Sequence, residues 1–230
     1  MANVLVVAPH PDDEVLGCGI ALQHHASIGD DVTVCIISNR AYGHEYDVSN
    51  DTREKDHAEK AISTLMGNVS HKVVFCNMKD ERLDVSCQDI LVQIESVYSE
   101  CQPDIVYLPW IGDMNQDHKA VFVAGTVLCR PHQKEMMPSK VLAYEVPSST
   151  DQAFYLGHSP FRPTLYVPAT TKEVMKKITA MNCYETESRK WPHSRSPDGI
   201  MTYAKWRGME SGLDMAEAFM VLRDITGVTR

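Results

Sequence analysis

Short apolar runs alternate with amphipathic stretches through the first half of the chain. The first run, residues 3–8, is β-branched and uninterrupted, which is typical of a strand buried on both faces of a parallel sheet. Further strands are predicted at 31–37, 73–75 and 105–108. The spacing of apolar residues predicts helices at 15–26, 51–66, 90–101 and 118–129. This alternation indicates a doubly wound α/β fold, in which helices flank a mostly parallel sheet.

The remaining residues are less regular. Two more strands are predicted at 141–146 and 164–167, and the loop between them contains Pro, Ser and Gly and is placed to cover a site. Helices are predicted at 171–189, 197–207 and 214–222. Because no internal repeat, low-complexity tract or linker interrupts the chain, a single domain spanning residues 1–230 is the simplest interpretation.

The composition narrows the possible partners. The formal net charge of −9 argues against a broad nucleic-acid surface, which would need clustered Lys and Arg, and favours a small-molecule partner. No apolar stretch approaches the roughly 20 residues of a transmembrane segment. Seven cysteines without paired spacing are typical of reduced thiols, and the expected localisation is therefore cytoplasmic.

Candidate chemistry follows two of the predicted strands. His10, Asp12 and Asp13 come directly after the first strand, and the strand at 105–108 is followed by Asp113, Asn115, Asp117 and His118. Parallel strands that end at the same edge of a sheet deliver such loops to one crevice. His10 and Asp13 can share a metal ion with a third ligand from the second loop, while Asp12 faces the open position. Such a set suits catalytic zinc without excluding iron, manganese or cobalt.

This arrangement predicts hydrolysis. The ion would lower the pKa of a water molecule toward about 7 and polarise an acyl oxygen, and Asp12 would take the water's proton as general base. Arg53 is expected to bind substrate, because the N-terminus of its helix should face the same crevice; otherwise it is a surface cation. His193 and Arg195 lie in a loop that either contributes to the site or only begins the following helix.

The sequence also resembles a known family. Residues 9–19, Arg53 with Glu54, and residues 115–118, 195–197, 206–208 and 216–219 are similar to motifs of the LmbE-like, or PIG-L, family of zinc-dependent N-acetyl-sugar deacetylases. The resemblance implies a Rossmann-like fold with its site at the C-terminal strand ends. It implies zinc ligands at His10, Asp13 and His118 and a general base at Asp12. It also implies N-acetylglucosamine-containing substrates on a carrier, a thiol precursor or an antibiotic, and a homo-oligomer.

The second motif departs from the family at one position. Many members have His-Pro-Asp-His where this chain has Asn115-Gln116-Asp117-His118, so the imidazole thought to protonate or stabilise the tetrahedral intermediate is missing. An amide at Asn115 can donate a hydrogen bond to an oxyanion but cannot supply a proton. The hypothesis is that His193 enters the site in its place, that Arg195 binds substrate, and that Asp117 orients a neighbouring imidazole, most simply that of His118.

Two alternatives stay open at this stage. A metal-activated water and a base do not select the acyl group, so hydrolysis of another amide or of a carbamoyl group is one alternative. In the other, Asn115 marks lost catalysis in a module that only binds a metal or a sugar. The pocket is expected to be built by the loops after the second and fourth strands, the 147–163 segment and the His193 loop.

Overall fold

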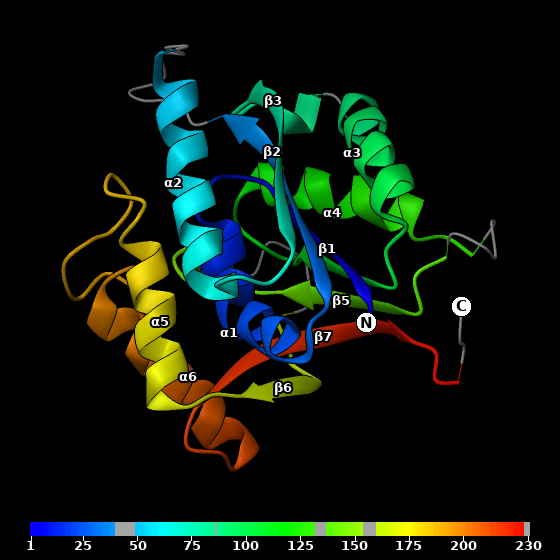
Figure 1. Cartoon of the computed structure of the whole chain (residues 1–230). Coiled ribbons are helices and arrows are strands. Elements are labelled where there is room, and N and C mark those ends of the chain that lie inside the picture. Colours follow the sequence, from blue (N-terminus) through cyan, green and yellow to red (C-terminus); the bar gives the residue numbers. More distant parts are fainter. Residues whose placement is uncertain (40–48, 86, 132–136, 154–159, 228–230) are drawn as a thin grey trace.

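The computed structural model describes residues 1–39, 49–85, 87–131, 137–153 and 160–227, in which helices cover both faces of one sheet (Figure 1). The strands are β1 (Asn3–Ala8), β2 (Asp31–Asn39), β3 (His71–Lys79), β4 (Ile105–Pro109), β5 (Lys140–Tyr144), β6 (Leu165–Pro168) and β7 (Ala216–Asp224). The helices are α1 (Asp13–Ile28), α2 (Ser49–Met66), α3 (Cys87–Cys101), α4 (Gln116–Leu128), α5 (Thr171–Met181) and α6 (Pro197–Ser211). Short 3-10 turns occur at Leu83–Val85 and Thr150–Gln152.

The strand order is β3-β2-β1-β4-β5-β7-β6. The first five strands in this order pair in parallel, and β7 runs antiparallel to both β5 and β6. The predicted α/β fold with a mostly parallel sheet is therefore confirmed. Strand β1 pairs with β2 on one side and with β4 on the other, so the order reverses between β1 and β4. A crevice for ligands forms at such a reversal, outside the carboxyl ends of the strands.

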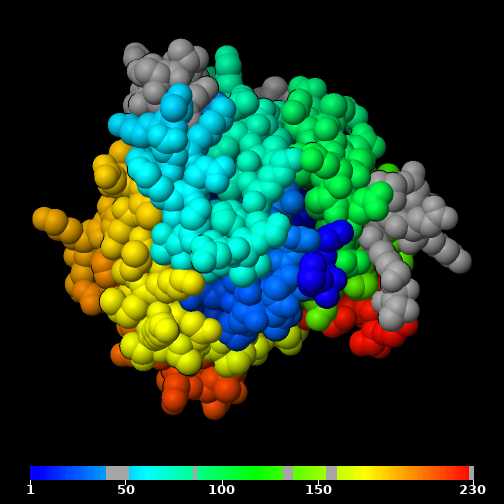
Figure 2. Space-filling model, viewed as in Figure 1, coloured from blue at the N-terminus to red at the C-terminus, as the bar shows by residue number. Residues whose placement is uncertain are grey.

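Alternate residues of β1 enter two separate cores. Val4 and Val6 pack beneath α1, α2 and α5, whereas Leu5 and Val7 pack on the opposite face with apolar residues of α3 and α4. A strand that is buried on both faces has no polar positions, which explains the uninterrupted apolar run. In the space-filling view, blue residues of the N-terminal region reach the surface next to the cyan and yellow segments that include α2 and α5 (Figure 2).

The structure corrects one predicted element. Residues 214–222, predicted as a helix, instead contribute to the strand β7. Ala, Glu, Met and Leu favour helices, but Phe219 pairs with Tyr144 of β5 and with Leu165 of β6, so tertiary pairing overrides local propensity. Since the two pairings place β7 inside the sheet, its first half is buried on both faces.

Helix α5 begins as predicted but ends earlier. The side chain of Thr170 and that of Glu173 form a capping box at its start. The helix stops at Met181 rather than near residue 189, and turns follow. These turns direct Tyr184 and Glu187 into the protein, where both are buried. The segment 182–196 thus lies against the C-terminal end of the sheet instead of continuing a surface helix.

Candidate active site

Three potential metal ligands converge where β1 and β4 end. His10 lies in the loop after β1, Asp13 begins α1, and His118 lies in the first turn of α4. His10 Nδ1 is 3.1 Å from Asp13 Oδ2, His118 Nε2 is 3.2 Å from the same oxygen, and the two nitrogens are 3.3 Å apart. All three side chains are buried. Two loops about a hundred residues apart in sequence therefore build one cluster.

The spacing of these atoms fits a tetrahedral ion. Bonds of about 2.0–2.1 Å at tetrahedral angles place ligand atoms about 3.3 Å apart, and the three observed separations lie within a few tenths of an ångström of this value. Two imidazoles and one carboxylate also form a donor set that zinc and related divalent ions accept. Three protein ligands leave a coordination position open, as a catalytic site requires.

Asp113 orients the imidazole of His118. Its Oδ2 lies 3.1 Å from His118 Nδ1, an ion-pair contact that is not aligned as a linear hydrogen bond. The carboxylate itself is fixed by hydrogen bonds from the hydroxyl groups of Ser149 and Thr150. Burial disfavours the charged imidazole, but Asp13 and Asp113 outweigh burial and raise the pKa of His118 to about 9. Nδ1 therefore faces Asp113, and Nε2 faces the metal position.

Asp117 contacts the other histidine, which corrects the sequence-based hypothesis. Its Oδ2 is 3.2 Å from His10 Nε2, and Asp80 Oδ1 lies 3.0 Å from the same nitrogen. Neighbouring residues on a helix point about 100° apart, so Asp117 and His118 cannot face each other. Asp117 is held by the backbone amides of Glu81 and Leu83 at 2.8 and 3.1 Å. Carboxylate partners at Nε2 direct Nδ1 of His10 toward the metal position.

Asp80 was missed by sequence reasoning. It follows β3, which extends to Lys79 rather than ending at residue 75 as predicted. Had the strand been assigned its full length, the rule that parallel strands end at one edge would have included Asp80.

Asp12 adopts an unusual backbone conformation. It occupies the N-cap position of α1 with φ 108° and ψ −24°, and its side chain makes no capping hydrogen bond. A left-handed conformation in a residue other than glycine costs about 1–3 kcal/mol and is concentrated at functional sites. The Asp12 amide donates to Glu14 Oε2 at 3.1 Å, and its Oδ2 accepts from Arg195 Nη1 at 2.8 Å. The carboxylate is thus directed away from its own helix.

Arg195 contacts the predicted general base rather than an open surface. Its Nη1 also lies 2.7 Å from Glu187 Oε2, and its Nε donates to Ser148 Oγ at 2.9 Å. The guanidinium therefore links the β5–β6 connection, segment 182–196 and Asp12. Ser148 contacts Arg195, and Ser149 and Thr150 contact Asp113. The first part of the 147–163 segment, which was predicted to cover the site, therefore lies beside it. Residues 154–159 lie outside the described part of the chain.

Three further residues were predicted to contribute to the site. His193 is exposed, and its Nδ1 accepts a hydrogen bond from the backbone amide of Arg195 at 3.1 Å. Burial, followed by the charges of Arg195 and Arg189, lowers the pKa of His193. Asn115 caps α4 by accepting from the amide of Asp117 at 2.8 Å. Arg53 is exposed near the start of α2, and residues 40–48 lie outside the described part of the chain.

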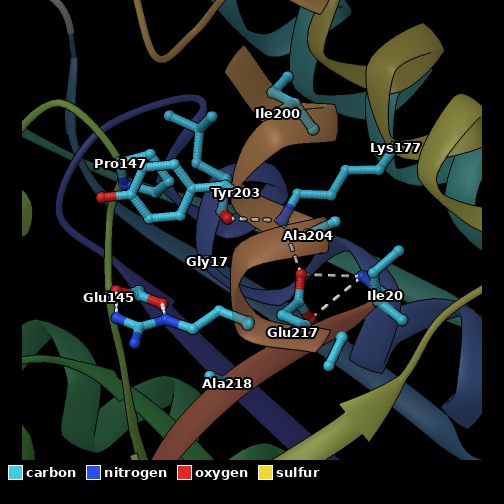
Figure 3. Close-up of a pocket in the computed structure, with 13 residues that line it drawn as sticks. Gly17, Ile20, Glu145, Pro147, Lys177, Ile200, Tyr203, Ala204, Glu217 and Ala218 are labelled. Carbon is cyan, nitrogen blue, oxygen red and sulfur yellow. Dashed lines mark hydrogen bonds and ion pairs between the residues drawn. The ribbon is translucent and has the colours of Figure 1, made fainter. Parts of the chain in front are cut away.

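A second buried polar cluster joins α1 to α5 and β7 (Figure 3). Glu217 accepts hydrogen bonds from the amides of Ile20 and Ala21, and Lys177 Nζ lies 2.7 Å from both Glu217 Oε1 and the carbonyl oxygen of Leu16. The cluster borders a cavity of about 30 Å³. A Cβ atom at Gly19 would lie 2.8 Å from Lys177 Cγ, so this glycine admits the lysine.

Comparison with known proteins assigns the family. Residues 5–129, more than half of the chain, match the family model PIG-L, described as GlcNAc-PI de-N-acetylase. The chain belongs to the PIG-L family. The match to this deacetylase family covers both segments that build the candidate site, the one after β1 and the one after β4. A relative of this PIG-L chain is the uncharacterized deacetylase YaiS of Escherichia coli K12, which is 28% identical over 152 residues, covering 64% of this chain and 75% of YaiS.

Solved structures share the fold of this PIG-L protein. The conserved protein TT1542 from Thermus thermophilus superposes with a TM-score of 0.73 at 19% identity, covering 100% of both chains. N,N'-diacetylchitobiose deacetylase from Pyrococcus horikoshii gives 0.73 at 19%, covering 96% of this chain and 84% of that one. The 4-carboxy-2-hydroxymuconate hydratase GalB from Pseudomonas putida KT2440 gives 0.74 at 21%, covering 100% and 99%. Within the described residues, no helix is both long and apolar enough to cross a membrane.

Proposed function

We propose that this PIG-L protein is a metal-dependent hydrolase that removes the N-acetyl group from an amino-sugar-containing substrate. The observation that carries the proposal is the convergence of His10, Asp13 and His118 at tetrahedral spacing beside Asp12. Family membership supports deacetylation, and the donor set supports zinc or a similar divalent ion. A domain spanning residues 1–230, a cytoplasmic location favoured by reduced thiols, and a homo-oligomer complete the proposal.

The residues have separate roles in this reaction. An ion held by the three ligands would acidify a water molecule and polarise the acyl oxygen. Asp12 takes the proton as the water attacks the carbonyl carbon, and it returns the proton to the nitrogen as the C–N bond breaks. The products are acetate and a free amine. Arg195 holds the Asp12 carboxylate in place, while Asp113 and Asp117 orient the two histidines.

Two further residues are assigned to stabilising the tetrahedral intermediate. The side-chain oxygen of Asn115 is engaged in capping α4, so its amide nitrogen is the group that can donate to an oxyanion. His193 is assigned the role of the missing family histidine, which is to stabilise the tetrahedral intermediate, and its Nδ1 contact with the Arg195 amide leaves Nε2 to donate a hydrogen bond. Arg53 and Arg195 are assigned to substrate binding at the mouth of the site.

The names of the relatives support the proposed substrate class. One fold neighbour is named N,N'-diacetylchitobiose deacetylase and another is named teicoplanin deacetylase, so acetylated sugars alone or on an antibiotic are the first compounds to examine. One neighbour is described as a zinc-inhibited form, so the choice of ion belongs to the test. Hydrolysis of another amide or of a carbamoyl group is the alternative reaction.

A reconstitution experiment tests the proposal. The protein is stripped with a chelator, reloaded separately with zinc, cobalt, manganese or iron(II), and incubated with N-acetylglucosamine, N,N'-diacetylchitobiose and their carbamoyl analogues. We expect equal amounts of acetate and free amine with at least one ion, and neither product from Asp12→Asn. A fully loaded protein that hydrolyses none of these compounds would contradict the deacetylase assignment for this substrate class and favour the metal- or sugar-binding module.

A further inference from the structure

The left-handed turn at Asp12 is held from inside the protein. Glu14 is fully buried, and its Oε2 accepts from the Asp12 amide at 3.1 Å. Its Oε1 accepts from the Tyr184 hydroxyl at 2.5 Å. Tyr184 is also fully buried and belongs to the turns after α5, 170 residues away in sequence. Both oxygens of Glu14 are thus occupied by groups that fix its position.

A purely local role does not explain this arrangement. An acidic residue in the first turn of a helix interacts favourably with the helix dipole while remaining in water, so stabilising α1 does not require burial. Burial of a carboxyl group is costly unless hydrogen bonds replace those to water. Glu14 is nevertheless buried, and it is the residue that accepts a hydrogen bond from the backbone amide of Asp12. Glu14 contacts neither of the two histidines within the described residues.

We propose that Glu14, held by Tyr184, is a positioning residue that fixes the Asp12–Asp13 turn so that the two adjacent carboxylates face different partners. Asp12 reaches Arg195, whereas Asp13 reaches both histidines. With an ordinary negative φ at Asp12, the chain would leave the His10 loop in a different direction, and Asp13 would no longer meet His118. This inference rests on the proposed function, because it takes Asp13 as a metal ligand.

Zinc affinity tests the inference without any substrate. Zinc is titrated against a chromophoric chelator in the presence of each variant, and thermal melting of the metal-free protein is recorded alongside. Glu14→Ala is expected to weaken zinc binding at least tenfold, because it removes the carboxylate that accepts from the Asp12 amide. Glu14→Gln is expected to stay within about threefold of wild type, since its side-chain oxygen can accept from Asp12 while its NH2 group donates to Tyr184.

Two further variants separate positioning from general destabilisation. Leu65→Ala removes a fully buried core side chain of α2 and is expected to lower the melting temperature while leaving zinc affinity within twofold. Tyr184→Phe removes only the hydroxyl that holds Glu14 and is expected to weaken zinc binding about threefold. This variant keeps the inference testable if Glu14→Ala does not fold.

The outcomes distinguish the inference from the proposed function. Wild-type affinity in Glu14→Ala or in Tyr184→Phe would overturn the positioning role, and so would equal losses in Glu14→Gln and Glu14→Ala. Asp13→Ala serves as the reference, because it removes a ligand and should abolish tight binding. If Asp13→Ala binds zinc as wild type does, the proposed metal site itself is wrong, and the role of Glu14 falls with it.

Discussion

Replacing Asp113 with alanine is expected to weaken metal binding by about 10–100-fold, although Asp113 is not a ligand. Its Oδ2 lies 3.1 Å from His118 Nδ1, and Ser149 and Thr150 fix the carboxylate in a fully buried position. Without Asp113, nothing described on that side of the ring selects the Nδ1–H tautomer, and part of the population presents the wrong nitrogen. The expected loss corresponds to about 1.4–2.8 kcal/mol of binding free energy.

Competition with a chromophoric chelator measures this loss directly. Asp113→Asn should lose less, because its amide oxygen can still accept from His118, and Thr150→Val should remain near wild type because the carboxylate and the Ser149 contact persist. Since Asp113→Ala also leaves the buried Ser149 hydroxyl without its acceptor, at about 1–3 kcal/mol, melting curves must show that the variant is folded during the titration. Folded Asp113→Ala with wild-type zinc affinity would refute the orienting role.

Four further outcomes follow from the geometry. Asp12→Asn should retain one metal ion per chain yet lose at least a hundredfold in kcat, and loss of metal would instead make Asp12 a ligand. In the metal-free protein, the charged His118 imidazole stabilises the fold below about pH 6.5, and this stabilisation is lost as the pH rises through about 9. The free energy of unfolding, measured in urea, should therefore fall over this pH range by roughly 3 kcal/mol more in wild type than in His118→Gln. Gly17→Ala should destabilise the fold by about 1–3 kcal/mol, because its Cβ would overlap the ring of Tyr144; an unchanged melting temperature would contradict this. His193→Ala should reduce kcat on an N-acetylated sugar without changing metal content, and full turnover would exclude His193 from stabilising the tetrahedral intermediate.

The parallel half of the fold was predictable because its strands are buried on both faces. Such strands consist of continuous apolar residues, and amphipathic helices separate them, so local pattern and tertiary position coincide. Strand β7 was not predictable in the same way. Its residues favour a helix by propensity, and only its pairing with β5 and β6 makes it a strand.

The site was predictable where its residues directly follow a strand. His10 follows β1, and His118 lies in the first turn of the helix after the adjacent strand β4, so topology alone brings them together. Asp80, Tyr184 and Glu187 gave no such signal, because isolated acidic or tyrosine residues outside recognised elements are common on protein surfaces. Their contacts depend on the full length of β3 and on the early end of α5, and sequence patterns place element boundaries least reliably.

The most direct test of the metal site is the metal content of the purified protein. Elemental mass spectrometry is applied to wild type and to His118→Ala after both have been supplied with zinc and passed over a desalting column. The convergence of His10, Asp13 and His118 predicts about one ion per wild-type chain and almost none in the variant. A folded wild-type protein without metal, or a variant that retains it, would contradict the site on which the proposed hydrolysis depends.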